Sequence, residues 1–237
     1  MVKKSVLRKY AIVLLAVFLL VPILIFIAAL IYPDYSPGYE YLSDLGRYRL
    51  SAEHGNGANW TPMIIFNSSL ILMGFATILY FALRGRFGGG NLLLRIVGAV
   101  LGIVGGIGFI GIALTPHDVF PQWHNIFTFN GLILCFACFI NSFCADGIFA
   151  KRSLNMVWLV FILQVGITNY TFLHQIAIDA LPGSPTGQIC QKLFMMAYWL
   201  YMVAQSVILL VFTSTKAENN LFIANTNPIS TLWFYKR

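Results

Sequence analysis

The sequence predicts an all-α integral membrane protein, a compact bundle of six transmembrane helices with both termini in the cytoplasm. Hydrophobic residues make up 59% of the 237-residue chain and charged residues only 10%, whereas a soluble domain carries roughly 25% charged residues. The mean hydropathy is +0.78. In addition, the apolar residues fall into long runs, and the basic residues collect between alternate runs. These observations together predict the fold class.

Six apolar runs come close to the roughly 20 residues that a helix needs to cross a bilayer. They cover residues 11–32, 61–83, 93–114, 124–146, 154–173 and 190–212. We therefore predict one transmembrane domain over residues 1–212 and a short cytoplasmic tail over residues 213–237. The first run is longer than the apolar core of a signal peptide, which is roughly 7–15 residues. Its length favours a retained helix over a cleaved signal.

The third run has glycine at four-residue spacing, at Gly98, Gly102 and Gly106. Small residues at this spacing let two helices approach closely, so we expect this helix near the centre of the bundle. The longest loop precedes the second run and covers residues 33–60. Within it, the segment YEYLSDLGRYRL has the aromatic and apolar spacing of a short helix, which we expect to lie flat at the membrane surface.

Positive charge is distributed unevenly about the six runs. All but three of the 15 lysines and arginines fall on one side of the predicted bundle; the exceptions are Arg47, Arg49 and Lys192. Cytoplasmic loops collect Lys and Arg, the positive-inside rule, so we predict that both termini are cytoplasmic. The net charge of +7 then reflects membrane topology rather than nucleic-acid binding.

The acidic residues and histidines show the opposite bias. All four histidines fall on the predicted extracytoplasmic side, and only Asp146 and Glu218 among the acidic residues lie toward the cytoplasm. We therefore expect a polar site at the extracytoplasmic face.

The segment TPHDVFPQWH, residues 115–124, gathers His117, Asp118 and His124 between two apolar runs. Three interpretations remain open. Imidazole and carboxylate groups suit zinc, but the spacing matches no recognised metal motif, so no cofactor is predicted. A His–Asp pair could act as acid and base on a lipid, because histidine titrates near neutral pH. The segment could also be a structural loop, so the sequence leaves open whether the chain is an enzyme.

Polar residues at or near a membrane are costly unless they are paired, which makes them site candidates. The candidate catalytic residues are Asp44, Asp118 and His124. The candidate headgroup-binding residues are Ser43, Asn67, His117, Gln191 and Lys192. Lys192 is the only basic residue at the outer end of a run. Its ammonium group needs a carboxylate, phosphate or headgroup partner, and Asp44 and Asp118 are the expected carboxylates.

Taken together, these elements resemble a prokaryotic membrane family catalogued as domain of unknown function 998. The matching motifs are LSDLG at 42–46, FN at 66–67, GIALTPHD at 111–118 and His124, and the resemblance covers residues 10–210. This family is similar in architecture to the Frag1/DRAM/Sfk1 group, which implies a six-helix bundle. The eukaryotic relatives act in glycolipid-anchor remodelling, phosphoinositide organisation and lysosomal membranes, which points toward lipids. The link over residues 47–60 is longer than is usual in the family.

We therefore expect a lipid-related protein of the plasma (inner) membrane of a prokaryote, which binds or organises lipids or acts as an accessory factor. Its partners are expected to be membrane lipids and not nucleic acid. The alternative is a membrane-embedded lipid-modifying enzyme that uses the Asp/His set. A small-solute transporter is less favoured, because the sequence has no clear inverted repeat and no pair of proline-broken helices.

Overall fold

The computed structural model describes residues 4–87, 92–143, 166 and 186–214. Its longer helices are α1 (Lys4–Ile31), α2 (Trp60–Phe87), α3 (Leu92–Leu114), α4 (Pro121–Thr128), α5 (Asn130–Phe143) and α7 (Thr186–Ser214). Two short 3-10 helices, η1 (Leu42–Gly46) and η2 (Ala52–His54), lie in the loop between α1 and α2. The described residues contain no strand, and one isolated bridge pairs Arg49 with Ala58. The all-α prediction is confirmed.

Four helices are long and apolar enough to cross a membrane. They correspond to Ser5–Ile31, Trp60–Gly85, Leu92–Leu114 and Gly187–Val211, and they match four of the predicted runs. The predicted run at 154–173 lies outside the described residues except for residue 166, as does nearly all of the predicted tail. The described helices therefore establish a helical membrane protein, and the two spans predicted at residues 124–146 and 154–173 stay predictions.

The predicted fourth run is divided into two helices. α4 begins at Pro121, a residue type suited to the first turn of a helix, and Phe129 separates α4 from α5. Near the junction, the Thr128 hydroxyl donates to the carbonyl of His124, four residues earlier, at 2.8 Å. A hydrogen bond from a threonine hydroxyl to the carbonyl four residues earlier tends to bend a helix. The prediction missed the junction because apolar periodicity does not report this hydrogen bond.

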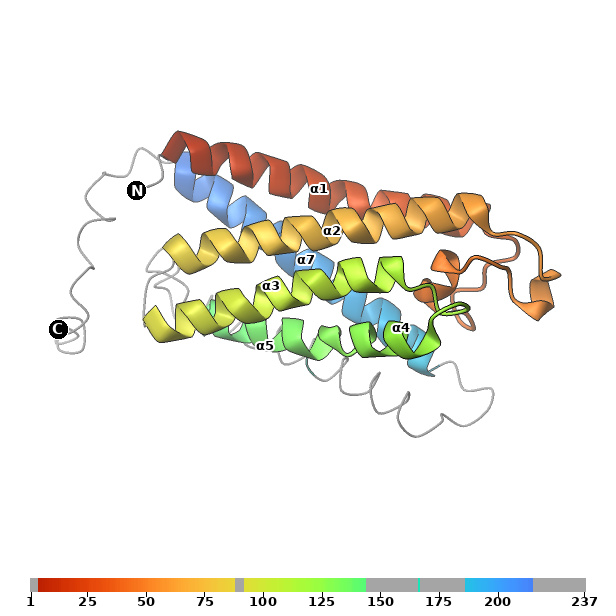
Figure 1. Ribbon diagram of the computed structural model, residues 1–237. Helices are drawn as coiled ribbons and strands as arrows, with labels where there is room; N and C mark the ends of the chain where they lie inside the picture. Colours follow the sequence, from red (N-terminus) through yellow and green to blue (C-terminus); the bar gives the residue numbers. More distant parts are fainter. Residues whose placement is uncertain (1–3, 88–91, 144–165, 167–185, 215–237) are drawn as a thin grey trace, which may run out of the picture.

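The helices run side by side in one bundle (Figure 1). α2 packs against both α1 and α3, α3 also contacts α4 and α5, and α1 contacts α7. Glycine permits the closest crossing. A Cβ atom at Gly74 of α2 would lie 2.7 Å from the carbonyl oxygen of Gly106 of α3, so the two backbones are in direct contact. This packing confirms the expectation drawn from the glycine spacing of the third run.

The outer surface of α1 is apolar. Phe26 is 62% exposed and Leu30 is 68% exposed, while the opposite face of the same helix buries Leu14, Phe18 and Val21. A surface of this kind is unfavourable in water and suits contact with lipid tails. The exposed apolar residues thus agree with a membrane location.

We call the end of the bundle that carries residues 32–59 and 115–120 the loop end, and the end where α1 begins and α2 finishes the N-terminal end. At the loop end, Leu45 of η1 is fully buried and joins the core with Phe66 of α2. The predicted surface helix over residues 39–50 is helical only at Leu42–Gly46. Burial of Leu45 explains the difference, because it folds this segment onto the bundle.

Candidate functional site

The predicted site residues come from η1, α2, the α3–α4 turn, α4 and the start of α7, and they all lie at the loop end (Figure 1). Five segments that are distant in the sequence therefore meet there. Whether they form one reactive centre depends on what each side chain contacts.

Asp44 closes the turn in which it lies. Its carboxylate accepts the backbone N–H of Tyr41 at 2.8 Å, three residues earlier, at the start of η1. The other carboxylate oxygen is 3.3 Å from the Arg47 guanidinium. A carboxylate in this position satisfies a helix-start N–H that has no partner within the helix. Asp44 therefore shapes η1.

Asp118 connects the α3–α4 turn to the loop between α1 and α2 by hydrogen bonds. Its two carboxylate oxygens accept the backbone N–H groups of Tyr48 and Arg49, at 3.2 and 2.9 Å. These contacts join residues about 70 positions apart in the sequence. They also anchor the link over residues 47–60.

His124 is 95% buried and is held by the turn before α4. Its Nδ1 lies 2.7 Å from the carbonyl oxygen of Thr115; because a carbonyl only accepts, Nδ1 carries the proton. The ring of His117 packs edge to face on that of His124, with centroids 5.4 Å apart. Among the described residues, no group of three or more His, Cys, Asp or Glu side chains is placed to hold a metal ion.

The start of α7 meets η1 through two of the predicted headgroup-binding residues. Gln191 accepts the backbone N–H of Leu42 at 2.7 Å. The Lys192 ammonium donates to the carbonyl oxygens of Glu40 and Gln188 and lies 5.8 Å from the centroid of the Tyr35 ring. The hydrogen bonds of Lys192 thus go to backbone carbonyls, while the negative charges of Asp44, one of the two expected carboxylates, and of Glu40 also act on its ammonium group.

Asn67 belongs to the same junction. Its amide donates to the carbonyl oxygen of Gly46 at 3.2 Å, so α2 bonds to the end of η1. A Cβ atom at Gly46 would lie 2.6 Å from the Asn67 side-chain oxygen. Glycine at the end of the LSDLG motif therefore permits this close approach, and a larger residue would displace the Asn67 side chain.

The sequence reasoning missed a second acid–histidine pair. The Glu40 carboxylate lies 2.6 Å from Nε2 of His54, and both side chains are nearly 90% buried. Tyr35 lies nearby, and burial raises the pKa of its hydroxyl, helped by the negative charges of Glu40 and Asp44. The enrichment of acids and histidines on one side of the predicted bundle was the only signal for this pair.

A cavity lies between η1, α2, α3, α4, α5 and α7 at the loop end; the space in it that no atom fills, part of which is open solvent, is about 520 Å³. Its walls are mostly apolar, with polar groups supplied by Ser43, Thr128, Asn130 and Gln191. Of the predicted site residues, Ser43 and Gln191 line it. Asp44, Asp118 and His124 are not among the lining residues. The structure therefore separates the candidate catalytic set from the cavity.

Asn130 contributes a buried polar side chain to the cavity wall. It is 95% buried, and its amide nitrogen donates to the carbonyl oxygen of Gly105. Within the described part of the chain, its side-chain oxygen has no hydrogen-bond partner. A buried polar atom without a partner is costly, so this oxygen is suited to accept a hydrogen bond from a ligand. Sequence reasoning missed Asn130 because it sits at the α4–α5 junction.

The fold and the cavity define a helical multi-pass membrane protein with a mostly apolar site between its helices. A family model described as "Protein of unknown function (DUF998)" matches residues 14–214, and the chain belongs to this family. The family prediction made from the LSDLG, FN and GIALTPHD motifs is thereby confirmed. No curated protein and no solved structure matches the chain.

Proposed function

We propose that the protein binds a membrane lipid in the loop-end cavity, and that its role is to bind or organise lipids without transforming them. The observation that carries the proposal is the unpartnered oxygen of Asn130 in the wall of a mostly apolar cavity. Ligand sites commonly combine apolar walls with a few polar groups that orient the ligand. A lipid supplies both parts, since its hydrocarbon suits the walls and a hydroxyl or amide donor suits Asn130.

The proposal includes an orientation and a location. Arg8, Lys9, Arg84 and Arg95 all belong to the N-terminal end, and basic residues favour the cytoplasmic side. The cavity then faces the extracytoplasmic side of the plasma membrane of a prokaryote. A lipid in the outer half of the bilayer would have direct access to it.

The alternative function, a lipid-modifying enzyme, receives less support from the contacts. Asp44 and Asp118 each accept backbone N–H groups, and Nδ1 of His124 donates to a backbone carbonyl. These bonds hold the loop end together, as polar groups must where water is scarce. The geometry thus favours a structural role for the set that the sequence proposed as acid and base.

Neighbouring methionines on α7 allow a matched test. Met195 lines the cavity, whereas Met196 is 51% exposed. The M195W variant should fill the cavity and lose bound lipid, while M196W adds the same bulk outside it. Native mass spectrometry of protein purified in mild detergent measures the bound lipid. We expect retention in wild type and M196W and at least a tenfold loss in M195W, because overpacking costs about 1–3 kcal/mol. Equal lipid retention in both variants would contradict the proposal.

A further inference from the structure

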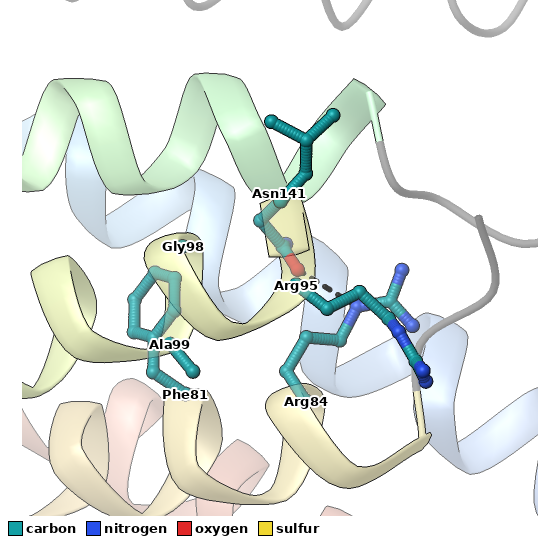
Figure 2. A pocket seen from close by; sticks show the side chains of 7 residues that line it. Phe81, Arg84, Arg95, Gly98, Ala99 and Asn141 are labelled. Atoms are coloured by element: carbon teal, nitrogen blue, oxygen red, sulfur yellow. Dashed lines mark hydrogen bonds between the residues drawn. The ribbon is translucent and has the colours of Figure 1, made fainter. Parts of the chain in front are cut away.

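The helix α5 has a buried asparagine near each end, and the two differ in how their polar groups are paired. Asn130 and Asn141 are each 95% buried. The Asn141 oxygen accepts Nε–H of Arg84 at 2.8 Å (Figure 2). Its amide donates to the hydroxyls of Tyr80 and Tyr201, at 3.0 and 2.8 Å. These bonds tie α5 to α2 and α7, so Asn141 has a structural role.

Asn130 keeps an acceptor toward the loop-end cavity. Its amide nitrogen donates to the carbonyl oxygen of Gly105, which sets the orientation of the amide because its nitrogen side alone can donate. Gly108 lets this side chain approach α3, since a Cβ atom there would overlap the Asn130 amide. The other side of the amide is the oxygen without a partner in the described part of the chain. The cavity wall therefore holds an oriented oxygen that can only accept a hydrogen bond.

The lining of the cavity excludes a charged ligand group. Within the described part of the chain, no residue that lines it is charged; the polar ones are Ser43, Thr128, Asn130 and Gln191, and the rest are apolar or glycine. An ionised phosphate or ammonium group would lose its hydration on entering, and none of these residues would compensate its charge. The wall therefore favours an uncharged group.

The polar residues of the wall offer both kinds of hydrogen-bonding group. The Thr128 hydroxyl donates to the carbonyl of His124 at 2.8 Å, so its oxygen is left to accept. The Gln191 oxygen accepts the backbone N–H of Leu42 at 2.7 Å, so its amide nitrogen is left to donate. A hydroxyl group both donates and accepts and would find partners of both kinds here, with the Asn130 oxygen as its acceptor.

The size of the cavity limits which part of a lipid can enter. The space that the centre of a water molecule can reach is about 50 Å³, which is room for roughly four water-sized groups at about 10–15 Å³ each. A terminal hydroxymethyl group fits this space, whereas long acyl chains do not. The hydroxyl end of a lipid can therefore enter while its chains stay outside.

We propose that the loop-end cavity binds the terminal hydroxyl group of an uncharged lipid, a diacylglycerol or a long-chain alcohol, and that this hydroxyl donates its hydrogen bond to the Asn130 oxygen. Phe66, Phe109 and Phe194 line the cavity and would pack against the carbon atoms next to the hydroxyl. This inference rests on the proposed function and narrows it from membrane lipids in general to neutral lipids.

The test titrates defined lipids against the purified full chain in mild detergent by native mass spectrometry. Two alcohols, dioleoylglycerol and oleyl alcohol, are each paired with their methyl ether, which cannot donate a hydrogen bond. Dioleoyl phosphatidic acid adds a phosphate to the same acyl chains. Asn130→Ala removes the acceptor, and Asn125→Ala is the matched control, because Asn125 is exposed on α4 and does not line the cavity.

We expect the wild type and Asn125→Ala to bind an alcohol about tenfold more tightly than its ether and than phosphatidic acid, since an unpaired buried oxygen costs about 1–3 kcal/mol. Asn130→Ala should bind the alcohol about tenfold more weakly and no longer distinguish it from the ether. The tighter of the two alcohols identifies the kind of lipid. Equal binding of alcohol and ether by the wild type, a comparison that needs no variant to fold, would overturn the inference.

Titration of M195W and M196W separates this inference from the proposed function. If phosphatidic acid binds more tightly than either alcohol, and M195W loses it while M196W retains it, the inference fails and the proposed function stands. If M195W and M196W bind every compound equally, both fail.

Discussion

At the scale of single residues, the polar side chains of the loop end satisfy backbone groups. Asp44 bonds to a backbone N–H of its own turn, and Asp118, Asn67 and Gln191 each bond to a backbone N–H or carbonyl of another turn or helix. The sequence identified them as unusual because polar groups are rare in an apolar chain. Their partners are up to 149 positions away, so no local pattern could indicate them. Asn130 differs, because one of its buried polar atoms has no partner in the described part of the chain.

Substitutions of His124 test whether the polar side chains of the loop end have a structural role. Asparagine places its amide near the position of Nδ1 and can still donate to the Thr115 carbonyl, whereas glutamine places its amide near Nε2. We expect His124→Gln to lower the free energy of unfolding by about 1–3 kcal/mol, the cost of an unpaired buried polar group, and His124→Asn to lose less. Thermal unfolding in detergent measures the difference. If both variants unfold like the wild type while a lipid-modifying activity is lost, His124 is catalytic.

At the scale of elements, the α2–α3 contact organises the bundle. The backbones of Gly74 and Gly106 touch because neither residue has a side chain. Further along the contact, a Cβ atom at Gly102 would overlap the ring of Phe81. Small residues at four-residue spacing predicted such a contact from the sequence. The sequence did not indicate which helix packs against the glycines of α3, because any of the other apolar helices could supply a suitable face.

Gly106→Ala should disturb this contact. Its new Cβ atom would lie 2.7 Å from the carbonyl oxygen of Gly74, and a backbone atom cannot turn aside as a side chain can. We expect a loss of about 1–3 kcal/mol in unfolding free energy, the usual cost of overpacking. Gly38→Ala is the control, since nothing lies within 4 Å of its added methyl group. Thermal melting of both variants in one detergent gives the comparison. Equal melting temperatures would mean that α2 and α3 can move apart without loss of stability, which would contradict the prediction.

At the scale of the whole molecule, the two ends of the bundle differ in charge and chemistry. Arg84 and Arg95 lie at the N-terminal end, near the end of α2 and the start of α3, while the loop end holds the buried Glu40–His54 pair and the cavity. A membrane imposes this kind of polarity, because basic residues are retained on the cytoplasmic side.

Cysteine labelling in intact cells tests the orientation. Tyr39→Cys places a thiol at a position that is 72% exposed at the loop end, and Ser5→Cys places one at the exposed start of α1. A membrane-impermeant maleimide should label Tyr39→Cys strongly and Ser5→Cys only after the cells are broken. Each variant is compared with the wild-type chain, whose own cysteines set the background. Labelling of Ser5→Cys in intact cells would contradict the proposed topology and place the start of α1 outside the cell.

The sequence by itself determined the class of protein, the positions of four spans, the glycine-mediated contact and the family. These features follow from composition, apolar length and short motifs, each of which acts within about 20 residues of chain, the length of one span. Which polar residues lie together was decided only by the tertiary structure. The cavity and the Glu40–His54 pair each require side chains from segments or helices that the sequence does not place side by side. Helix packing sets those neighbours, because it depends on the shapes of whole faces and not on the spacing of residues along one helix.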